Sequence, residues 1–251
     1  MPAVTVVVPT LDEARALPRV LVPLRAVAAE RDLEIVVSDG ASSDETLAIA
    51  LGLADRVVVH RGPGRQTIAA GRNAGARAGA GEVILFVNAD VRFPDDLGGL
   101  VDALALAARD AGAATCSVRV HPDESTLADR AVLAACDAVF RAWTAAGRGM
   151  GRGECQAIRR DVFEAVGGYD ERLAAGEDFD LFDRVAREGR RRRRAGGVGY
   201  GVRILRDQVV YEDPRRYRRR GYPRVLASWA LNSLWVSTVG RSFHRAWEPV
   251  R

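Results

Sequence analysis

The feature that most constrains the fold is the β-rich run Glu82 to Val87, apolar from Val83 onward, which is followed by Asn88-Ala89-Asp90. The run is long enough for one buried strand, and the period-2 geometry of a strand places Asn88 and Asp90 on the same side. A carboxylate at the end of a buried strand is costly unless water, a hydrogen-bond donor or a cation stabilises it. The segment therefore predicts either a ligand site or an ordinary turn before a helix that starts at Pro94.

Short β-rich runs alternate with segments that have room for a helix. This alternation predicts an α/β fold with a mostly parallel sheet built from βα units. Strands are expected over residues 4–8, 33–38, 56–60, 82–87, 113–120 and 202–211. Helices are expected over residues 14–29, 66–78, 94–108, 127–146, 161–166 and 178–187, with a capping box from Ser42 to Glu45 in front of another one.

Polar side chains follow three of the first four predicted strands. The first strand leads into Pro9 and Thr10, the second ends at Asp39 and the fourth leads to Asp90. Strand ends of an open α/β sheet line its ligand crevice. A nucleotide site explains this coincidence better than structural caps do, although Asp12 fits a helix cap equally well.

Composition limits the class of protein. With 251 residues and 48% hydrophobic content, the chain can form one α/β domain with a C-terminal appendage. The net charge of +4 is concentrated in arginines at 190–194 and 215–220, which favours an anionic partner such as phosphate or lipid. No nucleic-acid-binding module is present, so we expect no nucleic acid partner.

Targeting and redox signals are weak. The three cysteines are far apart and show neither a zinc nor a disulfide pattern. No secretory signal is visible, and the apolar stretch 225–240 is interrupted by polar residues and too short to span a bilayer. We expect a cytoplasmic protein that is peripheral, if anything, at the inner face of the membrane.

The chain resembles the GT-A-fold glycosyltransferases, and among them most closely the large inverting group called family 2. The resemblance rests on VVVPTLDE at 6–13, EIVVSDGASSDET at 34–46, GRNAG at 71–75, NAD at 88–90, RRDVFEAVGGYDE at 159–171 and GEDFDL at 176–181. It covers most of residues 3–190, and the order and spacing of all these segments make it specific. The stretch DPRRYRRRGY at 213–222 is similar to an arginine-rich tail of one bacterial subgroup.

This resemblance implies a metal site. Asp90 matches the family's metal-binding aspartate, which holds Mg²⁺ or Mn²⁺ against the donor diphosphate. The family pattern is usually Asp-x-Asp, whereas this chain has Asn88 at the first position. Asn88 is therefore expected to contact ribose or bound water. One of the isolated histidines His60, His121 and His244 could complete the metal shell, and the sequence does not choose among them.

The resemblance also assigns the nucleotide contacts. Asp39 matches the residue that hydrogen-bonds the nucleobase, and a carboxylate acceptor suits the ring N–H groups of uracil or guanine. Pro9, Thr10 and Glu13 match the loop that frames base and ribose. Arg72 lies where the family often places a cation near the nucleotide, or else on a solvated helix face.

The transfer chemistry is implied at Glu177 and Asp178. Asp178 matches the base that takes the proton of the acceptor hydroxyl, and Glu177 would orient the acceptor. Acidic residues are also favoured at a helix N-terminus by the macrodipole alone. The residue types by themselves therefore leave a purely structural role open.

The function implied is metal-dependent transfer of a sugar from a UDP- or GDP-sugar to an unknown hydroxyl acceptor, with inversion. A retaining GT-A enzyme and a non-catalytic nucleotide-sugar binder are the alternatives. We expect a GT-A domain at 1–212, with a nucleotide half at 1–112 and an acceptor half at 113–212, and a helical tail at 213–251. The tail could be a lid over the diphosphate, a membrane contact with Trp229 and Trp235 at the interface, or a surface packed on the domain or in a homodimer.

Overall fold

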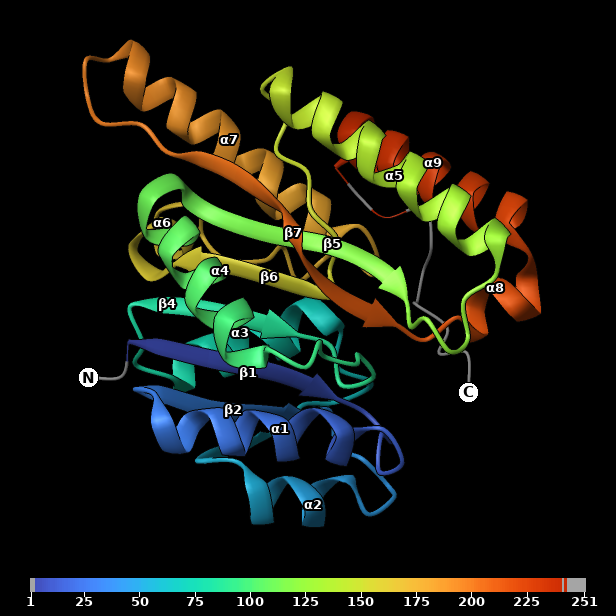
Figure 1. Ribbon diagram of the computed structural model, residues 1–251. Coiled ribbons are helices and arrows are strands. Elements are labelled where there is room, and N and C mark those ends of the chain that lie inside the picture. Colours follow the sequence, from blue (N-terminus) through green and yellow to red (C-terminus); the bar gives the residue numbers. More distant parts are fainter. Residues whose placement is uncertain (1–2, 241, 243–251) are drawn as a thin grey trace.

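A single seven-stranded sheet organises the computed structural model, which describes residues 3–240 and 242. The strands lie in the order β3-β2-β1-β4-β6-β5-β7 (Figure 1). Their bounds are β1 Val4–Thr10, β2 Leu33–Asp39, β3 Arg56–Val59, β4 Val83–Val87, β5 Gly112–Val120, β6 Cys155–Arg159 and β7 Gly201–Glu212.

The sheet is mostly parallel, as the alternation of strands and helices predicts. β1 pairs in parallel with both β2 and β4, and β5 pairs in parallel with β7. β6 is the exception, because it runs antiparallel between β4 and β5. We did not predict β6, since its five residues follow a glycine-rich loop directly and are too few to show a clear alternation.

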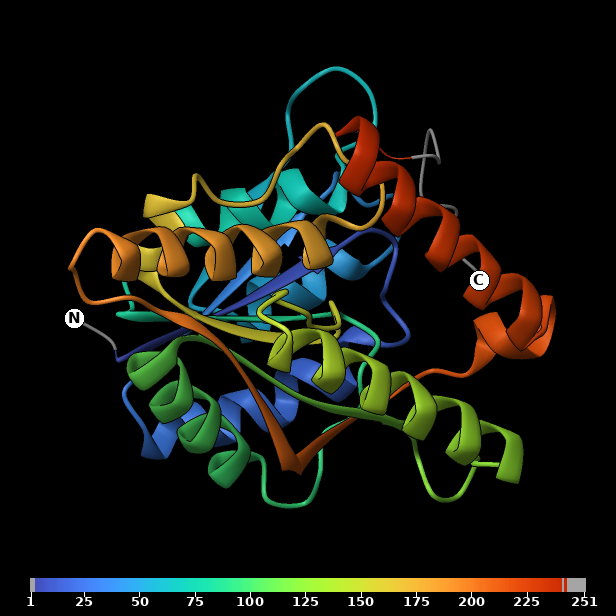
Figure 2. The ribbon, with the colours of Figure 1, turned by 90° about the horizontal axis from the view of Figure 1, so that it is seen from above.

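Helices cover both faces of the sheet (Figures 1 and 2). Alternation along β1 divides the core: Val6 and Val8 pack with α1, α2 and α4, while Val7 packs with α3, α6 and α7. The helices are α1 Leu17–Glu30, α2 Thr46–Leu53, α3 Ile68–Ala78, α4 Leu97–Ala111, α5 Leu127–Ala145, α6 Arg160–Ala165, α7 Glu177–Arg194, α8 Arg215–Arg220 and α9 Tyr222–Val239.

Several local expectations differ from the structure. The Ser42–Glu45 capping box is wrong, because the Ser42 hydroxyl donates to Asp39 and α2 begins one residue after Glu45 without a side-chain cap. The helix after Pro94 begins only at Leu97, where the Asp96 side chain accepts from the N–H of Gly99. α7 extends through the arginine run to Arg194, since these side chains favour the C-terminal end of the helix dipole.

The C-terminal segment forms helices, as expected, and packs against α5. Val120 and Leu133 form a small apolar cluster with Tyr217 of α8 and Val225 of α9. The buried Asp129 carboxylate on α5 accepts from Arg218 at 2.8 Å and from the Tyr222 hydroxyl. Within the described ranges, no helix combines the length and apolar character needed to cross a membrane.

Candidate active site

The carboxyl ends of β1 and β2 form a hydrogen-bonded corner. Thr10 Oγ1 donates to Asp39 Oδ1 at 3.0 Å, and the backbone N–H of Ser42 donates to Asp39 Oδ2 at 2.9 Å. Asp39 is completely buried. Its carboxylate therefore fixes the loop after β2, and a role in nucleobase recognition would use its remaining lone pairs.

The loop after β1 is held by the loop after β2. Asp12 adopts a left-handed backbone conformation at φ 53°, and its carboxylate accepts from the backbone N–H of Ser43 at 2.7 Å. The Asp12 side chain thus holds the two loops together and does not cap α1, whose N-cap is Ala16. The N–H of Glu13 donates to Thr46 Oγ1 at 2.7 Å. These bonds hold the loop after β1 and the loop after β2 together at the carboxyl edge of the sheet, next to half-buried Pro9.

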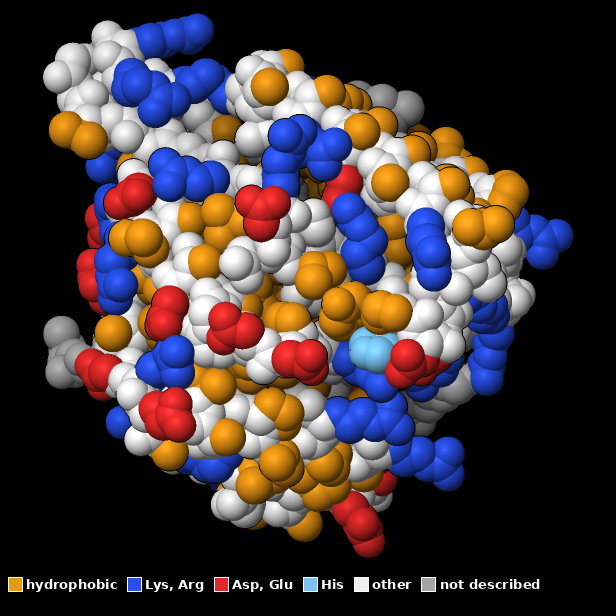
Figure 3. Space-filling view, viewed as in Figure 1, with side chains coloured by type: hydrophobic (Ala, Val, Ile, Leu, Met, Phe, Trp, Pro, Cys, Tyr) orange, Lys and Arg blue, Asp and Glu red, His pale blue; other side chains and the backbone are white. Residues whose placement is uncertain are grey.

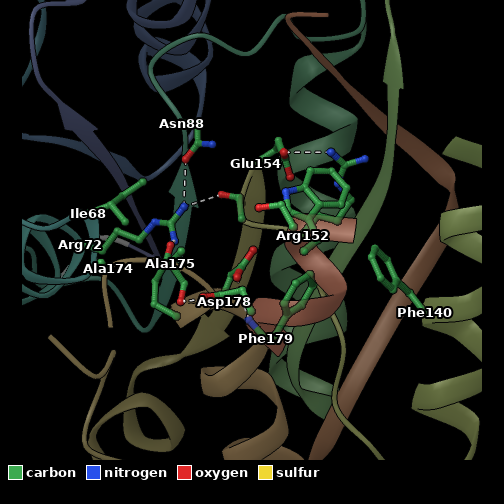
Figure 4. A pocket seen from close by; sticks show the side chains of 16 residues that line it. Ile68, Arg72, Asn88, Phe140, Arg152, Glu154, Ala174, Ala175, Asp178 and Phe179 are labelled. Atoms are coloured by element: carbon green, nitrogen blue, oxygen red, sulfur yellow. Dashed lines mark hydrogen bonds and ion pairs between the residues drawn. The ribbon is translucent and has the colours of Figure 1, made fainter. Parts of the chain in front are cut away.

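Arg72 joins three segments that are far apart in the chain (Figure 4). Its guanidinium donates to Glu177 Oε1 at 2.9 Å, to Asn88 Oδ1 at 2.9 Å and to the Gly153 carbonyl at 2.7 Å. It also lies over the Tyr169 ring, 5.1 Å from the ring centroid. The side chain is only 1% exposed, so the expectation of a solvated helix face is wrong.

The packing of α3 against β1 brings Arg72 to this position. Thr67 caps the helix by accepting from the N–H of Ala70 at 3.1 Å. One turn beyond Arg72, a Cβ on Gly75 would lie 2.3 Å from Val7 Cγ1. The glycine therefore permits the close approach of helix and sheet that carries Arg72 inward.

Asp178 lies in the first turn of α7, two residues after the left-handed Gly176 at φ 80°. Burial, together with the neighbouring Glu177 carboxylate, raises the pKa of Asp178 to about 7 against the opposing effect of Arg72. A carboxyl group with a pKa near neutrality is suited to accept a proton from an alcohol during a reaction. Asp178 and Glu177 thus lie beside Arg72.

A cavity of about 120 Å³ opens in front of Asp178 (Figure 4). Arg72 and Asn88 line one part of it, and Phe140 of α5 and Phe179 of α7 line another. Helix α9 closes it with Ser228, Trp229 and Asn232. The cavity thus combines aromatic surface with a few charged groups, which is typical of a small-molecule site.

A second buried arginine, Arg152, lies on the wall formed with α9. It donates to Glu154 at 3.1 Å, to Glu212 at 2.7 Å and to the Tyr217 hydroxyl at 3.1 Å. Its guanidinium lies 5.4 Å from the centroid of the Trp229 ring. Burial raises the pKa of Glu212 to about 7, opposed by Arg152. Trp229 thus forms part of the cavity wall.

Asn88 and Asp90 do not share partners, in contrast to the expectation from strand alternation. β4 ends at Val87. In the turn that follows, the Asn88 amide oxygen accepts a hydrogen bond from Arg72, while the Asp90 carboxylate pairs with Arg215 at 3.7 Å. Partial burial and the nearby carboxylates of Glu154 and Asp213 raise the pKa of Asp90. Of the arginines considered for a lid, Arg215 therefore reaches the predicted metal residue.

The residues around Asp90 fit a divalent cation that is shared with a bound diphosphate. Negative charge accumulates there, and Glu154 Oε2 is buried without a hydrogen-bond partner. Within residues 3–240 and 242, no three His, Cys, Asp or Glu side chains lie close enough to hold a metal alone. Diphosphate and water oxygens would have to complete the shell. His60 and His121 form no such group with Asp90, and His244 lies outside the described residues.

Sequence reasoning missed a set of residues that gather around the cavity from the second half of the chain. These are Phe140, Arg152, Glu154, Phe179, Ser228 and Asn232. The only hint in the sequence was the pair of opposite charges Arg152 and Glu154, which follows a glycine-rich segment. The contacts of these residues depend on β6 and α9, so no local pattern predicts them.

Comparison with known proteins agrees with this geometry. Residues 5–167 match the family model described as glycosyl transferase family 2. The succinoglycan biosynthesis protein ExoA of Rhizobium meliloti is 31% identical over 194 residues, which is 74% of this chain. The chain spans 58% of that relative's length.

Solved structures show the same fold. A mannosyltransferase, PcManGT from Pyrobaculum calidifontis in complex with GDP-Man and Mn²⁺, has a TM-score of 0.63 at 24% identity, covering 95% of this chain and 64% of that one. Glucosyl-3-phosphoglycerate synthase from Mycobacterium tuberculosis, in complex with Mn²⁺, UDP-glucose and phosphoglyceric acid, has a TM-score of 0.61 at 15% identity, covering 96% and 80%. These likenesses confirm the GT-A fold that the motifs predict.

The family model matches more than half of the chain, and the ExoA relative is more than 30% identical. Both findings identify the family. The protein belongs to glycosyl transferase family 2.

Proposed function

We propose that this protein transfers a sugar from a UDP- or GDP-sugar to an acceptor hydroxyl with inversion of configuration. The observation that carries the proposal is Asp178, a carboxyl group with a pKa of about 7 that lines the cavity beside Arg72 and Glu177. Similar folds hold GDP-Man or UDP-glucose together with Mn²⁺. The strand ends that carry Thr10, Asp39 and Asp90 in this chain support the same placement of the donor.

Asp178 acts as the base in this mechanism. Its carboxylate accepts the proton of the acceptor hydroxyl while the hydroxyl oxygen forms a bond to the anomeric carbon. On the opposite face, the bond between that carbon and the diphosphate oxygen breaks, and the nucleoside diphosphate leaves with the electron pair. Glu177 is fixed by its ion pair with Arg72 at 2.9 Å, which orients the acceptor side of the cavity. Such a base contributes about 10²–10⁴-fold to the rate.

We propose that Asp90 holds Mg²⁺ or Mn²⁺ together with the donor diphosphate. The cation supplies stabilisation of the negative charge on the leaving diphosphate. Arg215 lies 3.7 Å from Asp90 and is positioned to neutralise the same charge. Asn88 serves Arg72 instead of the metal, because its amide oxygen is taken by the guanidinium.

We also propose a division of labour along the chain. Residues 1–112 bind the nucleotide, residues 113–212 bind the acceptor, and the segment from 213 closes the cavity with α9. We assign the protein to the cytoplasm, in support of which all three cysteines, Cys116, Cys136 and Cys155, are free thiols.

The test combines a binding and a product measurement. Titration of UDP and GDP, each with and without Mn²⁺, against wild type and Asp90→Ala should show one nucleotide that binds with metal and loses affinity in the variant. Asp178→Asn should keep that affinity and lose transfer by roughly 10²–10⁴-fold.

Three results would count against the proposal. A product that retains the anomeric configuration assigns a retaining mechanism and removes the role of Asp178 as base. Transfer that is unchanged in Asp178→Asn has the same consequence. If no nucleotide binds under any condition, the proposal of a nucleotide-sugar-dependent enzyme is wrong, and the protein has another binding function.

A further inference from the structure

Helices α5 and α9 present an apolar outer surface. On α5, the exposed positions between Ala131 and Ala142 are alanines and Val139. On α9, Val225 and Asn232 point inward, while the opposite side carries exposed Ala227 and Leu231. The exposed fraction is 50% for Val139 and 54% for Leu231. Figure 3 shows apolar side chains gathered over α5 at the upper right.

Charge on this surface has one sign. Residues 215–240 contain six arginines and no acidic residue. The two acidic residues of α5, Asp129 and Asp137, are buried and paired with Arg218 and Arg119 at 2.5 and 2.6 Å. No exposed carboxylate therefore interrupts the surface formed by α5, α8 and α9, while Arg219 and Arg224 are exposed at its edge.

The cavity lies beneath this surface. Phe140 on α5 and Trp229 on α9 both line it, so its aromatic part lies between the two helices. The view from above shows α5 and α9 on the same side of the molecule, with α8 at the far right (Figure 2). A surface that received this side of the protein would lie next to the aromatic part of the cavity.

We propose that α5, α8 and α9 dock the protein on an anionic lipid bilayer, with the acceptor part of the cavity toward the lipid. The proposal rests on the proposed function for the role of the cavity, but the docking stands on the surface itself. Apolar helix faces enter the boundary between headgroups and acyl chains, and arginines bind anionic lipid at about 1 kcal/mol each. A second copy of the chain is disfavoured as the occupant, since it would bring the arginines of two copies together.

The acceptor class follows from this placement. A hydroxyl compound attached to a lipid would enter the cavity from the bilayer surface, with its polar part against Asp178 and Glu177. The aromatic residues Phe140, Phe179 and Trp229 would contact the faces of a sugar ring or the first apolar groups of the carrier.

The test is sedimentation of the full chain with vesicles of phosphatidylcholine alone or mixed with phosphatidylglycerol. We expect binding to the mixed vesicles and a loss of at least about tenfold in affinity for the double variant Val139→Asp with Leu231→Asp. The matched control is Val22→Asp with Leu51→Asp, which adds the same charge at apolar positions of α1 and α2 that are 54% and 65% exposed. This control should bind vesicles like the wild type.

Each other outcome overturns docking. If both double variants lose the same affinity for the mixed vesicles, the change in net charge explains the loss and the surface has no specific role. Unchanged binding of Val139→Asp with Leu231→Asp would assign the contact elsewhere. A wild-type dimer in solution, dissolved by the same variant, would make the surface a contact between copies. Nucleotide titration separates the two proposals, because both double variants should keep wild-type nucleotide affinity even if docking fails.

Discussion

Arg72 and Arg152 are both buried, both lie over an aromatic ring and both pair with glutamate, but they connect different parts of the molecule. Arg72 joins α3 and the end of β4 to the first turn of α7. Arg152 joins the loop before β6 to the end of β7 and to α8 through Glu212 and Tyr217. The first cluster fixes the proposed base relative to α3 and the end of β4, and the second fixes the wall of the cavity. Similar local chemistry can therefore serve the reaction on one side and the shape of the site on the other.

Replacement of Arg72 should have the largest effect on this comparison. In Arg72→Met, Glu177 loses its partner inside the protein and Asp178 loses the nearby positive charge, so transfer should fall by about 10³-fold. Loss of one partner of a buried ion pair costs about 3–5 kcal/mol in the free energy of unfolding, and we expect the upper end here. Denaturant unfolding and steady-state kinetics measure the two effects. Arg72→Lys keeps the charge and serves if the methionine variant does not fold.

Replacement of Arg152 should affect stability more than donor binding. In Arg152→Met, the Glu212 carboxyl can take up a proton, since its pKa is about 7, so the loss should lie at the lower end of about 3–5 kcal/mol. Nucleotide affinity should stay at the wild-type level, whereas KM for the acceptor should rise and Trp229 fluorescence should change. A loss of nucleotide affinity equal to that of Arg72→Met would remove the distinction between the two clusters.

A methyl group at Gly153 probes the packing around Arg72 and Asp178. A Cβ there would lie 2.9 Å from Arg72 Nη2 and 3.1 Å from Asp178 Oδ2. Gly153→Ala should therefore displace both groups and cost about 1–3 kcal/mol, with a parallel loss of kcat. The control is Gly52→Ala on α2, where nothing lies within 4 Å of the new Cβ and helix propensity favours alanine. If Gly153→Ala and Gly52→Ala have the same kcat, the added methyl group at Gly153 does not displace Arg72 and Asp178.

The smallest expected effect is a change in the pH dependence of stability. The Glu212 pKa rises from 4.5 in the unfolded chain to about 7 in the fold, so the folded state holds the proton longer. The free energy of unfolding should therefore fall as pH rises through this window, and Glu212→Gln should flatten the decrease. Asp178 titrates in the same direction. If only Asp178→Asn flattens the curve, the titration belongs to the Arg72 cluster alone.

The comparison also separates what sequence can predict from what it cannot. The first half of the sheet follows from local patterns: β1, β2 and β4 are apolar runs whose ends carry Thr10, Asp39 and Asn88, and parallel pairing brings those ends together. The motif with Glu177 and Asp178 likewise predicted their place at the start of α7. These features depend on few residues that are close in sequence.

The Arg152 cluster has no such local cause. Arg152 is 60 residues from Glu212 in the chain and meets it only because β6 runs antiparallel beside β5, which in turn pairs with β7. A five-residue strand after a glycine-rich loop gives no periodic signal. The position of Trp229 could not be predicted from the sequence either. The apolar pattern of α9 suits a helix on a membrane, on a subunit or on its own domain equally well.

The bond between Asn232 and the Ala175 carbonyl, at 3.0 Å, has a further consequence for how such enzymes diversify. It ties α9 to the loop that presents Glu177 and Asp178, and α9 also supplies Trp229 to the cavity. The segment from 213 to 240 is thus an exchangeable part that carries one wall of the cavity and its own attachment point. Grafting this segment from one family member onto another is a route to a new acceptor that leaves the nucleotide-binding strands untouched.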